Sequence, residues 1–262
     1  MANTVYENFY LSNEVEDQFK SHLDLANFVT VDNSLTGTAG MKRTIHVYKA
    51  TDGAEKLAQG VGNSKQIGVS YTSKDYEILL VQNDFRYFDE EAMKDPMLVP
   101  VGMKHAGTDL FNTMNGDIYA EFNKTTVTLA ATDFGFGTFA DAVAKLNIEE
   151  LNGVSIFAFV CPLDLAKIRK ALKETLQYVT AFATSGYVGT VAGVNIYTKK
   201  DATPGTIILG TKDAVTLFVK TGTEIEQKRD PDKRQNDIFS RKYYIPALTD
   251  ESKAVKITVT EG

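Results

Sequence analysis

The residues with the most recognisable chemical spacing are the glycines of the stretch 135–140 (GFGTFA), which match the pattern G-x-G-x-x-A. The stretch follows a predicted strand and opens a predicted helix, a context in which backbone N–H groups bind a pyrophosphate. However, the acid expected about twenty residues later would fall near 152–155, where the sequence has none. Phe136 would also crowd the approach of a phosphate. We therefore interpret these glycines as turn residues, and keep a small nucleotide-binding α/β enzyme as an alternative.

Residue types that act as nucleophiles or metal ligands are few and scattered. Cys161, the single cysteine, ends an apolar run beside a proline, which is typical of a small core residue. His22, His46 and His105 lie in segments predicted to be remote from it, and no spacing fits a metal site. The run 230–236 lacks the glycine and the bidentate glutamate of a calcium loop. We expect no catalytic residue, no cofactor and no metal ligand, and interpret the chain as non-enzymatic.

Composition is that of a soluble globular protein, with 43% hydrophobic and 24% charged residues over 262 positions. The net charge of -6 argues against a dedicated nucleic-acid binder, but is compatible with a protein that encloses nucleic acid without gripping it. A single cysteine forms no internal disulfide, which fits a reducing compartment. We see no signal peptide and no apolar run of about 18 residues, so we expect a soluble, non-secreted protein.

The stretch 100–122 is the element around which the chain is organised. Its apolar residues recur at spacings of mostly three and four and predict a helix roughly 35 Å long that lies against a sheet. Gly102, Gly107 and Gly116 each cost up to ~1 kcal/mol relative to alanine, so packing must hold this helix. Acids at 89–91 precede it with charge that favours a helix start. The predicted buried stripe is Met103, Ala106, Leu110, Phe111, Met114, Ile118 and Phe122.

The segments before this helix predict an arm and a long hairpin. Residues 1–35 are rich in aromatics and acids and include a predicted short helix at 13–26. The alternating stretch 41–50 predicts a strand, and a second strand is predicted at 75–82. Glycines and polar residues separate the two, which predicts a two-stranded excursion with a mobile tip around 53–65. An isolated hairpin is marginal in water, so another surface must support it, such as a neighbouring subunit.

Beyond the long helix, the pattern alternates between helices and strands. Thr138 is expected to cap a helix that continues through Leu146, and 163–178 predicts a second helix with a clear apolar face. The continuous apolar run 154–160 predicts a buried strand. Further strands are predicted at 125–131, 189–197, 206–209 and 214–220. The alternation over 138–220 indicates a compact α/β subdomain.

The end of the chain combines a charged run with two strands. Charged residues fill 228–242 and lead into a predicted strand at 243–245. The stretch 253–260 alternates cleanly and predicts the last strand. We expect both tail strands to return to the sheet near the long helix.

This ordered set of pieces resembles the major capsid protein of tailed bacteriophages, the Hong Kong 97 fold. That family often shows a buried strand followed by Pro-Leu-Asp and a helix, then a glycine-rich turn with Gly-x-x-Val, then a charged loop, an aromatic strand and a short tail strand. The arm, loop and long helix match in order and length more than in letters. The stretches that carry the resemblance are FADAVAKLN (139–147), SIFAFVCPLDLAKIRKAL (155–172), GYVGTVAGVNIYTKK (186–200) and EIEQKRDPDKRQNDIFSRKYYIPALTDESKAVKI (224–257).

The resemblance implies an α+β fold of the Hong Kong 97 type, with an N-terminal arm, an extended loop, a long spine helix, a peripheral sheet and an axial α/β domain. The implied divisions are an arm over 1–35, a strand and extended β-hairpin loop over 36–82, a peripheral domain with the spine helix over 83–134, an axial domain over 135–227, and return strands of the peripheral domain over 228–262.

The resemblance also implies a function. Subunits of this kind self-assemble into an icosahedral shell of hexamers and pentamers around double-stranded phage DNA, in the bacterial cytoplasm and without sequence-specific DNA binding. Because the chain starts almost at the arm, we expect a separate scaffolding protein, and also a portal. Alternatives are an encapsulin-like cellular nanocompartment and an adhesin or tail component. The lysine–asparagine cross-link of some relatives is not carried over. Contacts between subunits are expected at Lys56, Arg229, Asp230, Lys233, Arg234 and Arg241.

Overall fold

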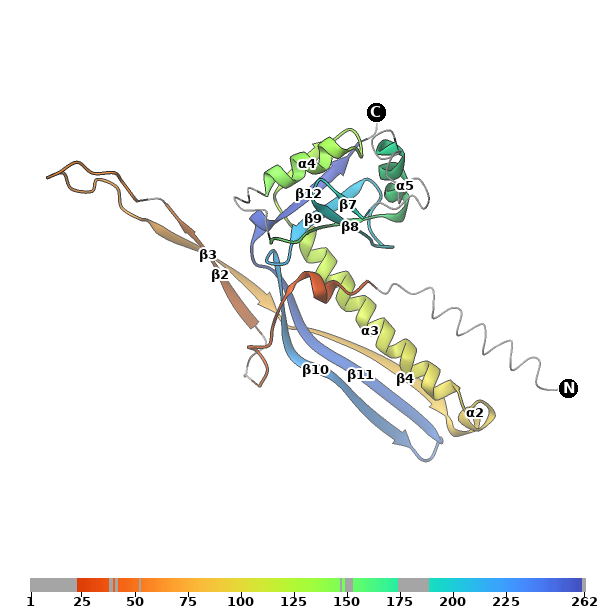
Figure 1. Ribbon diagram of the computed structural model, residues 1–262. Coiled ribbons are helices and arrows are strands. Elements are labelled where there is room, and N and C mark those ends of the chain that lie inside the picture. Colours follow the sequence, from red (N-terminus) through yellow and green to blue (C-terminus); the bar gives the residue numbers. More distant parts are fainter. Residues whose placement is uncertain are drawn as a thin grey trace.

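Two sheets, one long helix and a projecting hairpin make up the protein in the computed structural model (Figure 1). The structure describes residues 23–37, 40, 42–51, 53–146, 148, 153–173 and 189–260. The predicted arm before residue 23 and His22 lie outside these residues, as does most of the predicted helix at 13–26. The described end of that segment is a short 3-10 helix, η1 (Leu25–Phe28).

The predicted long helix is confirmed as α3 (Leu98–Phe122), which runs from the six-stranded sheet along the elongated sheet (Figure 1). The acids at 89–91 do not start it but belong to a separate short helix, α2 (Asp89–Lys94). Pro100 lies in the first turn of α3, where proline is tolerated. The residues of the predicted stripe that are buried are Ala106, Leu110, Met114, Ile118 and Phe122.

The ring of Phe85 explains why position 102 of this helix is a glycine. A Cβ at this position would lie 2.3 Å from Cζ of Phe85, so the ring can pack on the helix only where no side chain intervenes. At Gly107 and Gly116, a Cβ would meet nothing within 4 Å. The first glycine is therefore a packing requirement, and the other two are not.

An elongated four-stranded sheet lies against α3. Its strand order is β1 (Thr30–Asp32), β10 (Val215–Asp230), β11 (Gln235–Leu248), β4 (Leu79–Phe88). β1 is parallel to β10, and the other neighbours are antiparallel. α3 contacts β11 and β4 along their length.

A six-stranded sheet forms the compact end of the molecule. Its order is β5 (Thr128–Ala131), β12 (Ala254–Val259), β9 (Thr206–Thr211), β6 (Ile156–Val160), β8 (Val194–Thr198), β7 (Thr190–Val191). Phe157 and Phe159 of β6 pack with Phe122 at the end of α3. The alternate residues of β6 pack against α4 (Phe136–Lys145) and α5 (Pro162–Ala171). Burial on both faces accounts for the continuous apolar run of β6.

A two-stranded hairpin, β2 (Lys42–Ala50) and β3 (Val69–Glu77), projects away from both sheets (Figure 1). Its antiparallel register runs from Lys42 opposite Glu77 to Ala50 opposite Val69. The strand predicted at 41–50 and the two-stranded excursion are therefore confirmed. The second strand was predicted wrongly at 75–82, because buried Ile78 separates β3 from β4, which belongs to another sheet.

Three local predictions need correction. Thr138 does not cap α4: the N-cap is Gly135, and the Thr138 hydroxyl donates to Asp133 instead. The strand predicted at 189–197 is two short strands, because Ala192 and Gly193 turn the chain with φ of 50° and 80°. The helix predicted at 163–178 is confirmed from Pro162 to Ala171, and its predicted end lies outside the described residues.

The C-terminal charged run also differs from its prediction. Residues 228–242 are not a loop that feeds a strand, because β10 extends to Asp230 and β11 begins at Gln235. β11 returns beside α3 as predicted, but β12 pairs with β5 and β9 of the six-stranded sheet, so the expected return of both tail strands was wrong. A short 3-10 helix, η2 (Glu251–Lys253), joins β11 to β12 and so connects the two sheets. Sheet membership thus crosses the predicted domain limits at 135 and 228, which stay a prediction.

Candidate assembly surfaces and the junction between them

The projecting hairpin exposes an unusual amount of apolar surface. Five large apolar side chains of β3 and of the loop before it are between 48% and 68% exposed. Scattered exposed apolar residues are ordinary, but a group on one projecting element indicates a surface that another molecule covers. These residues are Leu57, Val61, Ile67, Val69 and Tyr71.

The loop at the far end of the hairpin has a defined internal structure. Nδ2 of Asn63 donates to the carbonyl oxygens of Gly53 (3.1 Å) and Lys65 (2.7 Å). The backbone N and the hydroxyl of Ser64 donate to the carboxylate of Glu55 at 2.9 and 2.6 Å, which lowers the pKa of that carboxyl. Lys56, one of the predicted contact residues, follows Glu55 and is exposed. These hydrogen bonds join the two sides of the loop, and the mobility predicted for the tip around 53–65 stays a prediction.

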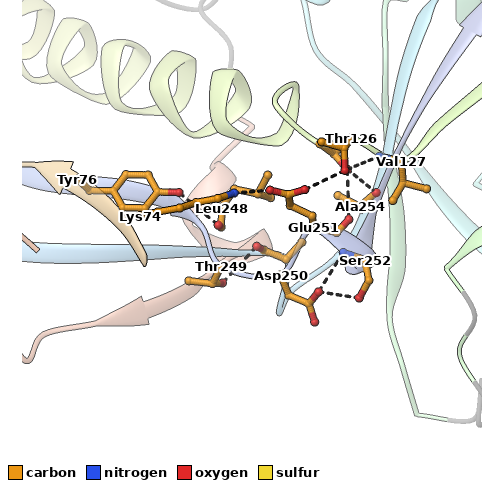
Figure 2. A network of polar contacts seen from close by, with 12 residues as sticks. Lys74, Tyr76, Thr126, Val127, Leu248, Thr249, Asp250, Glu251, Ser252 and Ala254 are labelled. Atoms are coloured by element: carbon orange, nitrogen blue, oxygen red, sulfur yellow. Dashed lines mark hydrogen bonds and ion pairs between the residues drawn. The ribbon is translucent and has the colours of Figure 1, made fainter. Parts of the chain in front are cut away.

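Glu251 lies at the base of the hairpin and connects three parts of the chain (Figure 2). Its carboxylate forms an ion pair with Lys74 of β3 and accepts a hydrogen bond of 2.8 Å from the hydroxyl of Thr126. Glu251 itself belongs to η2, between the two sheets. The bond to Glu251 raises the pKa of Lys74. This one carboxylate thus joins the hairpin, the link between the sheets and the chain that follows α3.

Further hydrogen bonds surround this carboxylate (Figure 2). The Tyr76 hydroxyl of β3 donates to the carbonyl oxygen of Leu248 at 3.3 Å, and burial raises the pKa of Tyr76. The Thr125 hydroxyl donates to the carbonyl oxygen of Ala254 at 2.8 Å. The hairpin is therefore attached to the body by polar contacts at its base.

A second charged surface lies where the β10–β11 turn meets α2. Arg229 pairs with Asp89 and Arg234 pairs with Glu90, both at 2.8 Å. Nδ2 of Asn236 also donates to Asp89, at 2.7 Å. The acids at 89–91 were expected to favour the start of the long helix, but Asp89 and Glu90 instead pair with arginines at the end of the elongated sheet.

The remaining predicted contact residues lie on the same ribbon. Lys233 is 4.0 Å from Asp230, and Arg241 pairs with Glu224 at 2.9 Å and with Glu226 at 3.2 Å. The structure therefore brings five of the six predicted residues to β10, β11 and their turn, each with a carboxylate or cation of the same chain nearby. Lys56 lies apart, on the hairpin loop. Their contacts with other subunits stay a prediction.

Sequence reasoning missed a cross-strand ion pair between Arg86 of β4 and Asp237 of β11. These residues are register partners, and Nε of Arg86 lies 2.6 Å from Oδ1 of Asp237. Gln235 also donates to Asp237, at 2.9 and 3.0 Å. Arg86 lowers the pKa of the Asp237 carboxyl. No signal in the sequence could have revealed this pair or Lys74–Glu251, because each depends on strand register or on a contact between distant segments.

The glycine-rich motif and the scattered polar residues form no site together. Oδ1 of Asp133 accepts a hydrogen bond from the backbone N of Gly135 at 2.7 Å, so the chain's own carboxylate takes the N–H that a phosphate would need. Cys161 is buried beside α5, His46 lies on the hairpin and His105 on α3. Within the described ranges, no group of three or more acids, histidines or cysteines is arranged to hold a metal. No helix of the same ranges has the length and apolar character needed to cross a membrane.

Comparison with known proteins finds similar phage capsid proteins. No family model matches the chain. The chain is 27% identical over 258 residues to a major capsid protein of Staphylococcus phage phiMR11, which covers 95% of this chain and 91% of that protein. Its fold matches the capsid structure of Cyanophage P-SCSP1u with a TM-score of 0.71, at 12% identity over 93% of this chain and 90% of that one.

A virus-like particle from Pyrococcus furiosus also matches the fold, with a TM-score of 0.59 and 11% identity over 97% of this chain and 99% of that one. The chain is therefore similar over nearly its whole length to a phage major capsid protein, and it has the mixed helix and sheet fold of phage capsid subunits, which is like that of the Hong Kong 97 type.

Proposed function

We propose that this chain is the structural subunit of a phage head, and that it self-assembles into an icosahedral shell of hexamers and pentamers that encloses double-stranded DNA. The observation that carries the proposal is the β2–β3 hairpin, which extends from the body (Figure 1). Its large apolar side chains are exposed. Such an element is marginal on its own and gains stability when a neighbouring molecule covers it.

The polar contacts of the hairpin support the same function. The Glu251 junction fixes its base to both sheets, and the Asn63 and Glu55 contacts give its loop a defined shape. A partner binds a pre-shaped element at a lower entropic cost than a disordered one. The hairpin is therefore built to reach a neighbouring subunit with its binding surface already formed.

In this proposal, each predicted division of the chain corresponds to one part of the structure. The hairpin is the extended loop, α3 is the spine helix, the elongated sheet is the peripheral domain, and the six-stranded sheet is the axial domain. Lys56, Arg229, Asp230, Lys233, Arg234 and Arg241 are proposed to contact neighbouring subunits, where charges act as networks more than as single pairs.

The proposed partners follow from charge and from the family. A net charge of -6 keeps the shell from adhering to the DNA that it holds. A separate scaffolding protein and a portal are proposed to act during assembly, which takes place in the bacterial cytoplasm. The enclosed DNA is proposed to be held without sequence-specific binding.

The size of the particles that the chain forms tests this function. The chain should be expressed alone and together with a candidate scaffold, and the soluble fraction of each should be measured by light scattering and negative-stain microscopy. Closed particles or capsomer rings are expected, and an unassembled monomer at high concentration under both conditions would contradict the proposal. Ile67→Ser is expected to reduce assembly, because it removes an apolar side chain that is 68% exposed on the hairpin, whereas Gln66→Ser beside it is the matched control and should not.

A cellular nanocompartment is the second candidate, and the matching fold of the Pyrococcus furiosus particle favours it. The sequence similarity to a phage protein over 95% of the chain favours the phage head. The two differ in what the particles enclose. Particles recovered from the native source should contain double-stranded DNA in the first case and protein without a genome in the second.

A further inference from the structure

One edge of the elongated sheet lacks a partner strand over most of its length. β1 lies at this edge but pairs with β10 only from Thr216 to Phe218, and the Thr36 hydroxyl then donates to the carbonyl oxygen of Val219. Farther along β10, no strand of the described residues pairs on this side (Figure 1). Every residue from Gly222 to Arg229 is exposed. A free strand edge presents unpaired N–H and C=O groups, which can pair with a strand of another chain.

The free part of β10 is regular enough to act as such a template. Its pairing with β11 has irregularities before Glu224 and then continues without a break from Glu224 to Asp230. Ile225 lies within this segment and is 61% exposed. Proteins usually protect a free edge with charged residues, prolines or bulges, and an exposed isoleucine does not serve that purpose. The segment therefore suits a strand that is covered by another molecule.

The charges of this segment are separated by sign. Glu224 and Glu226 lie in its first half, and Lys228 and Arg229 lie in its second half. A second copy paired in parallel and in register would place like charges opposite each other, which destabilises a sheet. An antiparallel copy places acids opposite bases instead. The pattern is therefore complementary to itself in the antiparallel direction, whereas a protective run of one sign would repel a copy in either direction.

We propose that this edge of β10 pairs with the same edge of a second copy of the chain, antiparallel and about a two-fold axis at Gln227. Glu226 then lies opposite Lys228 of the second copy, and the symmetry repeats this pair on the other side of the axis. Ile225 lies opposite Arg229 of the second copy, whose aliphatic stem covers it. The elongated sheets of the two copies become one continuous sheet.

The charges select this axis among its neighbours. Side chains that lie opposite each other in an antiparallel pair share a face, so the axis must pass through a residue rather than between two. An axis at Ile225 would place Glu224 opposite Glu226. An axis at Glu226 or at Lys228 would place that residue opposite its own copy. Only the axis at Gln227 places a neutral residue opposite itself and opposite charges on both sides.

The ends of the paired segment carry one like-charged pair. There, Glu224 lies opposite Asp230 of the second copy. Each of these acids has a cation in its own chain, since Arg241 is 2.9 Å from Glu224 and Lys233 is 4.0 Å from Asp230. These cations reduce the repulsion at the ends, so the pairs next to the axis decide the register.

A disulfide at the axis tests the register. Gln227→Cys places two thiols opposite each other, with Cα atoms ~5 Å apart, which is within the range of a disulfide. Ile225→Cys and Thr223→Cys are matched controls on the same face, but the axis would separate each from its copy by about 14 and 27 Å. The native Cys161 is buried and contributes little background.

The full chain of each variant should be oxidised mildly before and after assembly, and linked dimers measured on non-reducing gels. Gln227→Cys is expected to give roughly ten times more dimer than either control, because only its thiols meet disulfide geometry. Equal yields for the three variants, a higher yield for Ile225→Cys, or no dimer from Gln227→Cys under both conditions would each overturn the inference.

Charge reversal tests the complementarity. In the Gln227→Cys chain, Glu226→Lys makes the facing positions positive and Lys228→Glu makes them negative, so each change should lower the dimer yield roughly tenfold. An equimolar mixture of the two variants restores opposite charges across the axis and should recover the dimer. Mixing does not rescue a folding defect, so recovery separates a pairing role from a structural one. A mixture that gives no more dimer than the single variants would contradict the proposal.

This pairing needs only two copies of the chain and does not depend on a closed shell. If the wild-type chain forms particles while Gln227→Cys gives no linked dimer before or after assembly, the pairing is wrong and the shell stands. A linked dimer from a chain that forms no particle or ring would support the pairing and contradict the shell.

Discussion

In β6 of the six-stranded sheet, every side chain from Ile156 to Val160 is buried, whereas in β3 of the hairpin Val69 and Tyr71 are 65% and 64% exposed. Both strands are rich in residues that favour β structure. The difference lies in what covers them. β6 lies between α3 on one face and α4 and α5 on the other, all from the same chain. The hairpin has no such cover within the described residues.

The two regions therefore contribute differently to the folding of the subunit and to its assembly. The six-stranded sheet completes its core alone, so its stability belongs to the subunit. Among the described residues, the hairpin contacts the body at its base, through pairs such as Lys74–Glu251, and its apolar surface farther out is exposed. Changes in the two regions should therefore have separate effects on the unfolding of the subunit and on the assembly of particles.

The largest expected effect is in the core shared by α3 and β6. Phe122 is fully buried and packs edge-on against Phe157 and Phe159, with ring centroids 5.7 and 5.9 Å away. Phe122→Ala should lower the free energy of unfolding by about 3–5 kcal/mol, measured by denaturant unfolding of the unassembled chain. A loss below about 1 kcal/mol would contradict the view that this core is complete within the subunit.

Two glycines of α3 test how closely this helix packs on the elongated sheet. Gly102→Ala should cost about 1–3 kcal/mol, because the new Cβ would overlap Phe85. Gly107→Ala, the matched control, meets nothing within 4 Å and should stabilise the subunit by up to ~1 kcal/mol through helix propensity. Equal effects in denaturant unfolding would mean that α3 does not pack closely on β4.

The junction should respond locally. Glu251→Gln removes the partner of Lys74 and should reduce the protection of the base of the hairpin against hydrogen exchange, by roughly 1 kcal/mol of opening free energy. Protection of the six-stranded sheet should not change. Glu77→Gln, in an exposed pair with Lys42, is the control and should have little effect. A uniform loss of protection over the whole chain would show that the hairpin and body are one unit.

The Arg86–Asp237 pair predicts a pH dependence in the elongated sheet. Arg86 lowers the folded-state pKa of Asp237, so its stabilising contribution is present above the unfolded-state value of about 3.9 and is lost as pH falls through the folded-state value. Arg86→Gln should therefore destabilise the subunit at neutral pH, and the difference from the wild type should vanish in acid. A difference that is independent of pH, in unfolding curves collected from pH 7 to pH 2, would contradict this account.

The smallest effect on the subunit is expected in the hairpin. Val69→Thr keeps the branched shape and should change the unfolding free energy of the unassembled chain by less than about 0.5 kcal/mol. The same exchange at buried Val194 of β8 should cost about 1–3 kcal/mol, because it buries a hydroxyl. In assembly the order of the two variants should be reversed when they are compared at equal subunit stability. Val69→Thr should then raise the critical concentration for assembly more than the exchange at Val194 does. No effect of Val69→Thr on assembly would remove the hairpin from the subunit interface.

Hydrophobic periodicity by itself determined the long helix, the buried strand β6, the hairpin and the last strand. The stripe from Ala106 to Phe122 and the apolar run of β6 are local signals, because each side chain's environment follows from its place in the repeat. The order of these pieces also carried the resemblance that implied an α+β fold. No local pattern indicated that β3 ends before Ile78 or that the charged run 228–242 is mostly strand, since charged residues on an exposed sheet face have no apolar alternation.

Which distant segments contact each other could be seen only in the tertiary structure. Glu251 contacts Lys74 across 177 positions, and Arg86 meets Asp237 across 151. Such pairs depend on the register of β4 against β11 and on how η2 links the two sheets, and neither is encoded in a local pattern. The placement of the acids of α2 against Arg229 and Arg234 has the same origin. Local sequence fixes which face of an element is apolar, but the contacts of its polar face are chosen when the whole chain packs.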